Sequence, residues 1–155
     1  MSEGGAAIFK EEIYNQCLAI LNTKEQEFKA EIANLRDGIT NDSKSSMGDK
    51  YETSREMMQQ DINRLEQQLA ANRQQIFNLK AVQLHSKNQQ IIAGDIVYTS
   101  IGSFFISISL GEVKVGNQAV FVISPASPLG KLLIGRKKGD QFEMNKNKIE
   151  ILNLY

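Results

Sequence analysis

The first eighty residues carry apolar side chains in two heptad patterns. In the first run the steps between seam positions alternate between four and three residues, and the positions are Tyr14, Leu18, Leu21, Glu25, Phe28, Ile32, Leu35 and Ile39. The second run keeps these steps through Tyr51, Arg55, Met58, Ile62, Leu65, Leu69, Asn72, Ile76 and Leu79. This spacing holds one seam of a helix against a partner helix. The pattern therefore predicts two long helices of similar length.

A polar, turn-forming segment lies between the two runs, from Asp37 to Gly48. Two helices joined by so short a segment predict an antiparallel coiled-coil hairpin over residues 1–83, with its tip at about 38–49. At 1.5 Å per residue each arm is roughly 45–50 Å long. Pairing around such a tip brings Glu25, the polar interruption of the first seam, level with Arg64, so we expect an ion pair between them.

From Ile91 onward the pattern changes to one typical of strands. Three apolar residues, Phe104, Ile106 and Ile108, alternate with Phe105, Ser107 and Ser109, which predicts a half-buried strand. A Gly-Asn pair at 116–117 favours a two-residue hairpin turn. A last hairpin is predicted around 145–148. These elements indicate a small, mostly antiparallel sheet.

One short helix is predicted within the second half, over 128–134. Ser127 is a favourable N-cap, Pro128 suits the first helical position, and Gly135 follows the end of the helix. The fold class predicted is α+β: the helical hairpin, a linker around 83–90, and a β domain with one helix over 91–155.

Composition narrows the functional classes. The 155 residues hold 18 basic and 18 acidic side chains, so net charge does not attract the chain to nucleic acid or to a membrane. Cys17 is the single cysteine, and the first residues lack the basic and apolar regions of a secretory signal. We expect a cytoplasmic monomer that makes no direct, sequence-specific contact with nucleic acid and does not enter a membrane.

The segment Ser124–Asp140, which reads SPASPLGKLLIGRKKGD, resembles the C-terminal signature of the GreA/GreB transcription elongation factors. In that signature a strand enters Ser-Pro, a short helix ends in Leu-Ile-Gly-Lys, and a Gly-Asp turn precedes the last strands. The segment Tyr51–Glu56, YETSRE, is similar to the opening of the family's second helix. Together the two matches span most of the chain.

The resemblance implies a bacterial protein whose β domain has an FKBP-like fold and docks on RNA polymerase. It also implies that the hairpin enters the secondary channel of the polymerase, so that contact with DNA is indirect. The chain would not be an enzyme itself, and would at most stimulate RNA cleavage by the polymerase. The docking residues implied are Ser124, Pro125, Leu129, Gly130, Ile134 and Gly135.

The resemblance leaves two registers open at the hairpin tip. Family members that stimulate cleavage carry two acids, three residues apart, which hold Mg²⁺ together with the polymerase. Aligning Tyr51 places Lys44 and Met47 at these positions, which removes metal binding. Aligning Gly48-Asp49 instead places Asp49 and Glu52 there. A structural role for Asp49 is also open, because Ser46-x-x-Asp49 fits a capping box.

Two further classes of function remain as alternatives. An FKBP-like fold suggests a peptidyl-prolyl isomerase or chaperone. The chain has no tryptophan to form the floor of an isomerase pocket, however, and a fold alone does not determine function. A coiled-coil scaffold is the other alternative. The polar tip argues against it, since a long parallel coil would not interrupt its heptads there.

Overall fold

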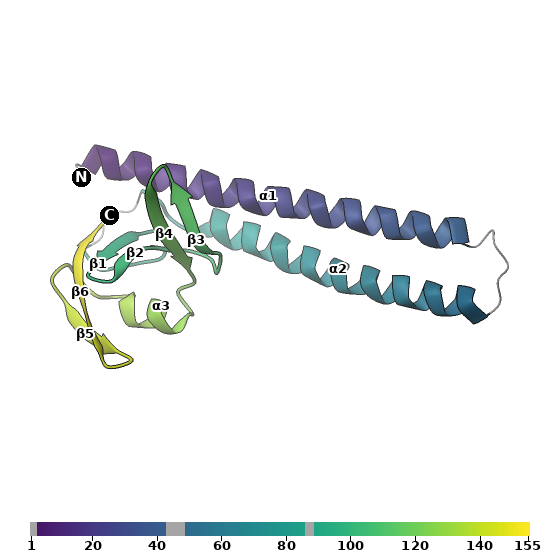
Figure 1. Cartoon of the computed structure of the whole chain (residues 1–155). Coiled ribbons are helices and arrows are strands. Elements are labelled where there is room, and N and C mark those ends of the chain that lie inside the picture. The colour runs from purple at the N-terminus through teal and green to yellow at the C-terminus, as the bar shows by residue number, and fades with distance from the viewer. Residues whose placement is uncertain (1–2, 43–48, 86–88) are drawn as a thin grey trace. The chain divides into compact units, whose positions relative to one another are not determined.

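The computed structural model describes residues 3–42, 49–85 and 89–155, with side chains for 4–41, 52–85 and 89–155. Within these ranges, two long helices precede six strands and one short helix (Figure 1). The elements are α1 (Glu3–Asp42), α2 (Asp49–Ala81), β1 (Ile96–Thr99), β2 (Gly102–Ile106), β3 (Gly111–Val115), β4 (Gln118–Ile123), α3 (Pro128–Leu133), β5 (Gln141–Met144) and β6 (Asn147–Leu154). The predicted α+β class, with a helical hairpin and a sheet that carries one helix, is confirmed.

The chain forms two compact units. Unit 1 consists of Met1–Ala19 and Phe77–Tyr155, and unit 2 consists of Ile20–Ile76. Each long helix therefore contributes residues to both units, and the boundaries between the units fall within the two helices. In the ranges that the structure covers, no helix is both long enough and apolar enough to cross a membrane.

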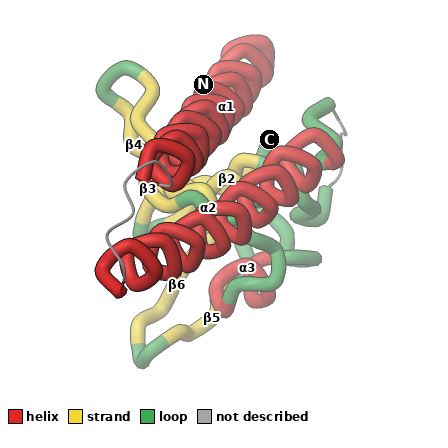
Figure 2. Tube along the Cα trace, turned by 90° about the vertical axis from the view of Figure 1, so that its right-hand side faces the viewer, coloured by secondary structure: helices red, strands yellow, loops and turns green. Residues whose placement is uncertain are grey.

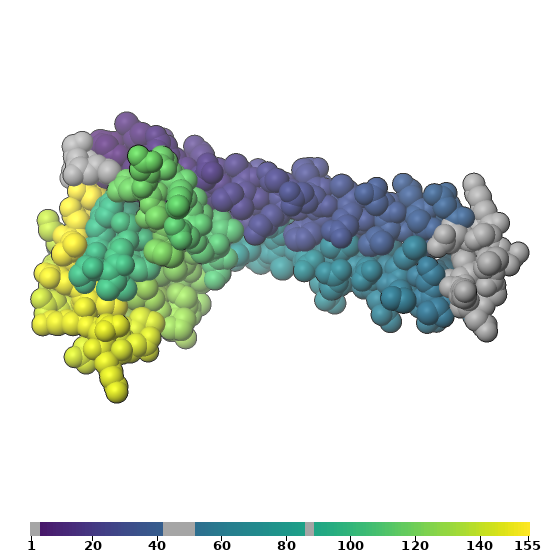
Figure 3. Space-filling model, viewed as in Figure 1, coloured from purple at the N-terminus to yellow at the C-terminus, as the bar shows by residue number. Residues whose placement is uncertain are grey.

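Unit 2 is the pairing of α1 with α2, which lie against each other in the space-filling view (Figure 3). The buried seam contains Ile32, Ile62, Leu65 and Leu69, with Phe28, Leu35 and Ile39 packed beside it. All seven side chains come from the two predicted heptad runs. The antiparallel pairing predicted from these runs is confirmed, because Glu25 pairs with Arg73 while Arg36, further along α1, pairs with Glu66, which comes earlier in α2.

The level at which the helices pair differs from the prediction. Glu25 Oε1 accepts a hydrogen bond of 2.7 Å from Arg73 Nε, whereas Arg64 lies 3.6 Å from Asp61 on its own helix. The expected pair of Glu25 with Arg64 is therefore wrong. The reason is that α1 stays helical to Asp42, through residues whose polarity suggested a loop. A longer first arm shifts its partners toward the end of α2.

The sheet of unit 1 has the strand order β3-β4-β2-β1-β6-β5. Both predicted hairpins are present, β3–β4 around Gly116-Asn117 and β5–β6 around Asn145-Lys146. The pairing is antiparallel except between β2 and β4, which run parallel with Ile106 opposite Ile123. Figure 2 shows these strands in yellow, gathered with α3.

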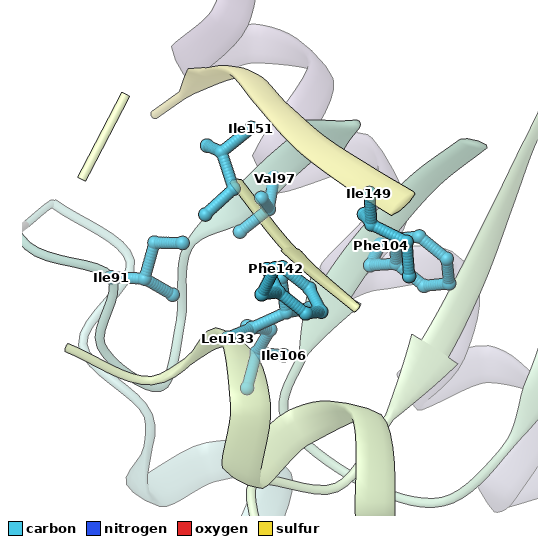
Figure 4. Close-up of a cluster of buried hydrophobic side chains, with 8 residues drawn as sticks. All are labelled: Ile91, Val97, Phe104, Ile106, Leu133, Phe142, Ile149 and Ile151. Carbon is cyan, nitrogen blue, oxygen red and sulfur yellow. The ribbon is translucent and has the colours of Figure 1, made fainter. Parts of the chain in front are cut away.

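One face of the sheet packs against α3. Its buried cluster is drawn in Figure 4 and consists of Ile91, Val97, Phe104, Ile106, Leu133, Phe142, Ile149 and Ile151. Leu129 and Leu132 of α3 pack against the cluster from its edge. This core holds α3 and the residues on either side of it at a fixed place on the sheet.

The opposite face of the sheet is buried as well, contrary to the predicted half-buried strand. Phe105 is fully buried and pairs with Ile96 and Val122, which are also buried. Ser107, expected to face solvent, is only 6% exposed. The first part of α1 belongs to the same unit, where Lys10 contacts Asp95 and a stripe of α1 side chains is buried as well. The stripe is Ala6, Phe9, Ile13 and Cys17.

Candidate functional site

The segment after β4 is built by a short series of local hydrogen bonds. Ser127 caps α3, because its Oγ accepts a 3.0 Å bond from the amide of Gly130. The same Oγ donates to the carbonyl of Ser124 at 2.7 Å. Pro128 occupies the first turn, and Gly135 follows the helix at φ +85°. The predicted cap, first residue and terminating glycine are all confirmed.

Gly130 lies against the end of β4. A Cβ built on it would sit 2.1 Å from the carbonyl oxygen of Ser124 and 3.0 Å from the Cα of Pro125. No side chain fits this space without moving the backbone. Gly130 thus lets the first turn of α3 pack directly on the Ser124-Pro125 turn.

The six residues implied in docking divide into three pairs. Leu129 and Gly130 face inward, the first on the α3 core and the second under the Ser124 carbonyl. Ser124 and Pro125 are half-buried, and the Ser124 hydroxyl accepts a 3.1 Å bond from the amide of Ala126. Ile134 and Gly135 are exposed. The surface available to a partner is therefore the Ser124-Pro125 turn together with the end of α3.

The end of α3 is tied to the segment before β1. Gly135 N donates to Ile91 O at 2.9 Å, and Ile91 N donates to Arg136 O at 2.8 Å. Arg136 also stacks over the ring of Phe142, with 4.5 Å between the guanidinium carbon and the ring centroid. These contacts hold Ile134 outward on a rigid base, with 38% of its surface exposed.

A cleft of about 540 Å³ opens beside the Ser124-Pro125 turn, within unit 1. The end of α2, the segment before β1 and the ends of β2 and β4 form its walls. Its lining residues are Asn78, Ala81, Val82, Gln83, Ile92, Ala93, Ser107, Ser124, Pro125 and Ala126. Every one of these side chains is uncharged, so the cleft suits a neutral group rather than an ion.

A buried ion pair, absent from the sequence-based candidates, lies at the start of β1. Lys10 Nζ is 3.8 Å from Asp95 Oδ1, and their side chains are 5% and 1% exposed. Asp95 also accepts a 2.9 Å bond from the amide of Ile92. Burial raises the pKa of Asp95 to about 6, against the opposing effects of the Ile92 amide and Lys10. Burial also lowers the pKa of Lys10, although Asp95 opposes this.

The candidates at the hairpin tip are only partly covered. Lys44 and Met47 lie outside the described residues. Asp49 begins α2, and Glu52 follows in the first turn with an exposed side chain. Residues three apart in a helix lie on the same face. Where the structure gives side chains, no three His, Cys, Asp or Glu residues gather into a group that could hold a metal ion.

Comparison with known proteins gives little further information. No protein-family model matches the chain, and no curated protein shows significant sequence similarity to it. One solved structure, of the transcription factor Gfh1, aligns over 92% of this chain and 92% of its own at 19% identity, with a TM-score of 0.34.

Proposed function

We propose that the protein is a transcription elongation regulator that binds bacterial RNA polymerase through the Ser124-Pro125 turn and the end of α3. In this proposal the helical hairpin of α1 and α2 enters the secondary channel of the polymerase. The chain catalyses no reaction of its own, and it contacts nucleic acid only through the polymerase. It acts as a cytoplasmic monomer.

The observation that carries the proposal is the segment Ser124–Asp140. Its sequence resembles the docking signature of the GreA/GreB factors, and each of its signature residues has a definite local role. Gly130 admits the Ser124 carbonyl, Ser127 caps α3, and the positive φ of Gly135 turns the chain back toward Ile91. A segment so constrained presents Ser124, Pro125 and Ile134 in one fixed arrangement, which supports a role in recognition.

The hairpin supports the second part of the proposal. Its apolar seam is closed within the chain, so the exposed surface of unit 2 is mostly polar, with Met57 as an exposed apolar side chain in the described ranges, and it suits a water-filled channel. At the tip, two carboxylates one helical turn apart, Asp49 and Glu52, have the donor chemistry that Mg²⁺ prefers, with further ligands from the polymerase. We favour the other register, in which Lys44 and Met47 occupy the tip and the protein occupies the channel without stimulating cleavage.

Binding of the full-length chain to bacterial core RNA polymerase tests the proposal. The informative variant is Ile134→Glu, which places a charge on the exposed end of α3. The matched control is Ile101→Glu, because Ile101 is also an exposed isoleucine of unit 1, at 51% exposure, but lies in the β1–β2 turn. We expect Ile134→Glu to weaken binding about tenfold or more, as for a central interface residue.

The control variant should bind within about twofold of the wild type, because rim or remote substitutions change affinity little. Circular dichroism melting should confirm that both variants stay folded. If both variants lost the same amount of binding affinity for the polymerase, the end of α3 would not be the docking surface. No binding by the wild-type chain would reject the proposed function itself.

A second function is favoured by one specific observation. An apolar cleft of about 350 Å³ lies on the α3 side of the sheet, where the rings of Phe104 and Phe121 stand 5.9 Å apart. Its other walls include Leu129, Met144 and Ile149. Such a pocket suits a proline ring, as a peptidyl-prolyl isomerase or chaperone requires. A protease-coupled isomerase assay on a proline peptide decides between the two functions, and we expect no acceleration.

A further inference from the structure

The two serines that follow the parallel strands β2 and β4 lie at the same level of the sheet. Ile106 pairs with Ile123, so Ser107 and Ser124 are the next residue on each strand. The amide of Ser107 donates to the carbonyl of Ile123 at 2.8 Å, which fixes the two strand ends together. Both serines line the cleft beside the Ser124-Pro125 turn.

The two hydroxyl groups differ in their hydrogen bonding. The Ser124 hydroxyl accepts from the amide of Ala126. The Ser107 hydroxyl is buried and, within the part of the chain that the structure describes, has no hydrogen-bond partner. Buried polar groups in folded proteins nearly always have a partner, because leaving one unpaired is destabilising. The Ser107 hydroxyl is therefore a donor and acceptor held ready at the wall of a cleft.

One wall of the cleft is held by a direct contact between two backbone segments. A Cβ on Gly94 would lie 2.3 Å from the carbonyl oxygen of Gln83, so the segment after α2 and the segment before β1 are in direct backbone contact. Gly94 holds this approach at φ +102° and donates to the carbonyl of Ile106 at 2.7 Å. This backbone contact fixes the position of one wall of the cleft.

The chemistry of the lining selects the class of ligand. No charged side chain lines the cleft in the described ranges, and most of its walls are small apolar groups such as Ala81, Ala93 and Ala126. An anion or a cation would lose its hydration without compensation there. A main-chain amide with small side chains matches the cleft, since it brings a carbonyl to accept from Ser107 and apolar atoms to cover the walls.

We propose that this cleft receives an uncharged polypeptide segment of the docking partner, and that the Ser107 hydroxyl donates a hydrogen bond to one of its main-chain carbonyls. The inference rests on the proposed function, because the cleft is continuous with the Ser124-Pro125 turn. It assigns Ser107 as a specificity-determining residue for the partner, on a different strand from the docking segment.

The variant Ser107→Ala tests the inference through two measurements with opposite signs. Removing an unpaired buried hydroxyl should leave the melting temperature of the free, full-length protein unchanged or raise it. The same change should raise the dissociation constant for core RNA polymerase about two- to tenfold, as for the loss of one neutral hydrogen bond. The control is Ser109→Ala, an exposed serine of the same segment that does not line the cleft.

The ionic strength of the titration adds an independent readout. Salt does not screen a contact between neutral groups. The factor by which Ser107→Ala weakens binding to the polymerase should therefore be equal at low and high salt. Unchanged affinity in Ser107→Ala would overturn the inference while wild-type binding keeps the proposed function. A lowered melting temperature, or a loss that shrinks at high salt, would also overturn it. If the wild-type chain does not bind the polymerase, the proposed function fails first.

Discussion

Asn72 on α2 donates a hydrogen bond of 2.8 Å from its Nδ2 to the carbonyl oxygen of Leu21 on α1. The amide side chain is 7% exposed and occupies a seam position of the second heptad run. A buried asparagine at such a position sets the level at which two helices pair, at some cost in stability. The bond therefore fixes the register of unit 2.

Substitutions at Asn72 should affect the stability of the protein and the pairing register of α1 and α2 in different ways. We expect Asn72→Ala to lower the free energy of unfolding by about 1 kcal/mol, the usual contribution of one hydrogen bond. Asn72→Leu should restore or raise the stability but loosen the register, seen as faster hydrogen exchange at the α1 amides around Leu21. Urea unfolding measures the first effect. The exposed Gln67→Ala is the control, and an equal loss there would contradict the assignment.

The close approach of Gly130 to Ser124 predicts a large cost for adding one methyl group. Gly130→Ala should destabilise unit 1 by about 3 kcal/mol or more, because the Cβ would overlap the Ser124 carbonyl. Gly4→Ala is the matched control, since nothing lies within 4 Å of a Cβ at that helical position. There we expect a gain of about 0.5–1 kcal/mol from the better helix propensity of alanine. Thermal melting of both variants checks the difference.

The raised pKa of Asp95 predicts a pH dependence of stability. The carboxyl has an ordinary pKa of 3.8 and one of about 6 in the folded chain, so the folded state binds a proton more tightly than the unfolded state. Its contribution to stability is fully present below about pH 4 and is lost as pH rises through about 6. The loss amounts to at most about 3 kcal/mol.

The variant Asp95→Asn isolates this effect from other titrating groups. The free energy of unfolding of the wild type, minus that of Asp95→Asn, should decrease between pH 4 and pH 7. Urea unfolding at several pH values measures the difference. A constant or increasing difference would mean that burial does not control the ionisation of Asp95.

Chemistry at the hairpin tip separates the two registers. In the register that we favour, the wild-type protein gives no RNA cleavage in stalled elongation complexes and competes with cleavage factors for the channel. Asp49→Ala would then cost only a helix cap, about 1 kcal/mol. In the other register Asp49→Ala and Glu52→Ala each abolish Mg²⁺-dependent cleavage but leave polymerase binding nearly intact. Transcript cleavage by the wild type, lost in both variants, would select that register.

Local sequence signals predicted the elements that depend on neighbouring residues. The cap at Ser127, the first helical Pro128 and the final Gly135 act within one helix, so short-range rules describe them fully. The hairpin turns at Gly116-Asn117 and Asn145-Lys146 are equally local. The heptad runs identified the seam of unit 2 because the period of a helix is itself a local property.

Long-range packing is what the sequence did not reveal. Alternation around Ser107 describes one strand, but it cannot tell whether a distant helix covers the second face. Lys10 and Asp95 are far apart in the chain, and charged residues are normally assigned to the surface. The pair of Glu25 with Arg73 depends on where α1 ends, which the polar residues from Asp37 onward obscured. The unpaired hydroxyl in the cleft follows from the packing of three separate segments.

Synthesis on the ribosome releases the first turns of α1 well before the sheet that they cover. At ordinary translation rates the delay before β4 emerges is on the order of ten seconds. During that interval the apolar stripe that includes Ala6, Phe9 and Ile13 has no strands to pack against. The burial of this stripe therefore waits for residues that are made much later, and until then its apolar side chains stay in contact with water.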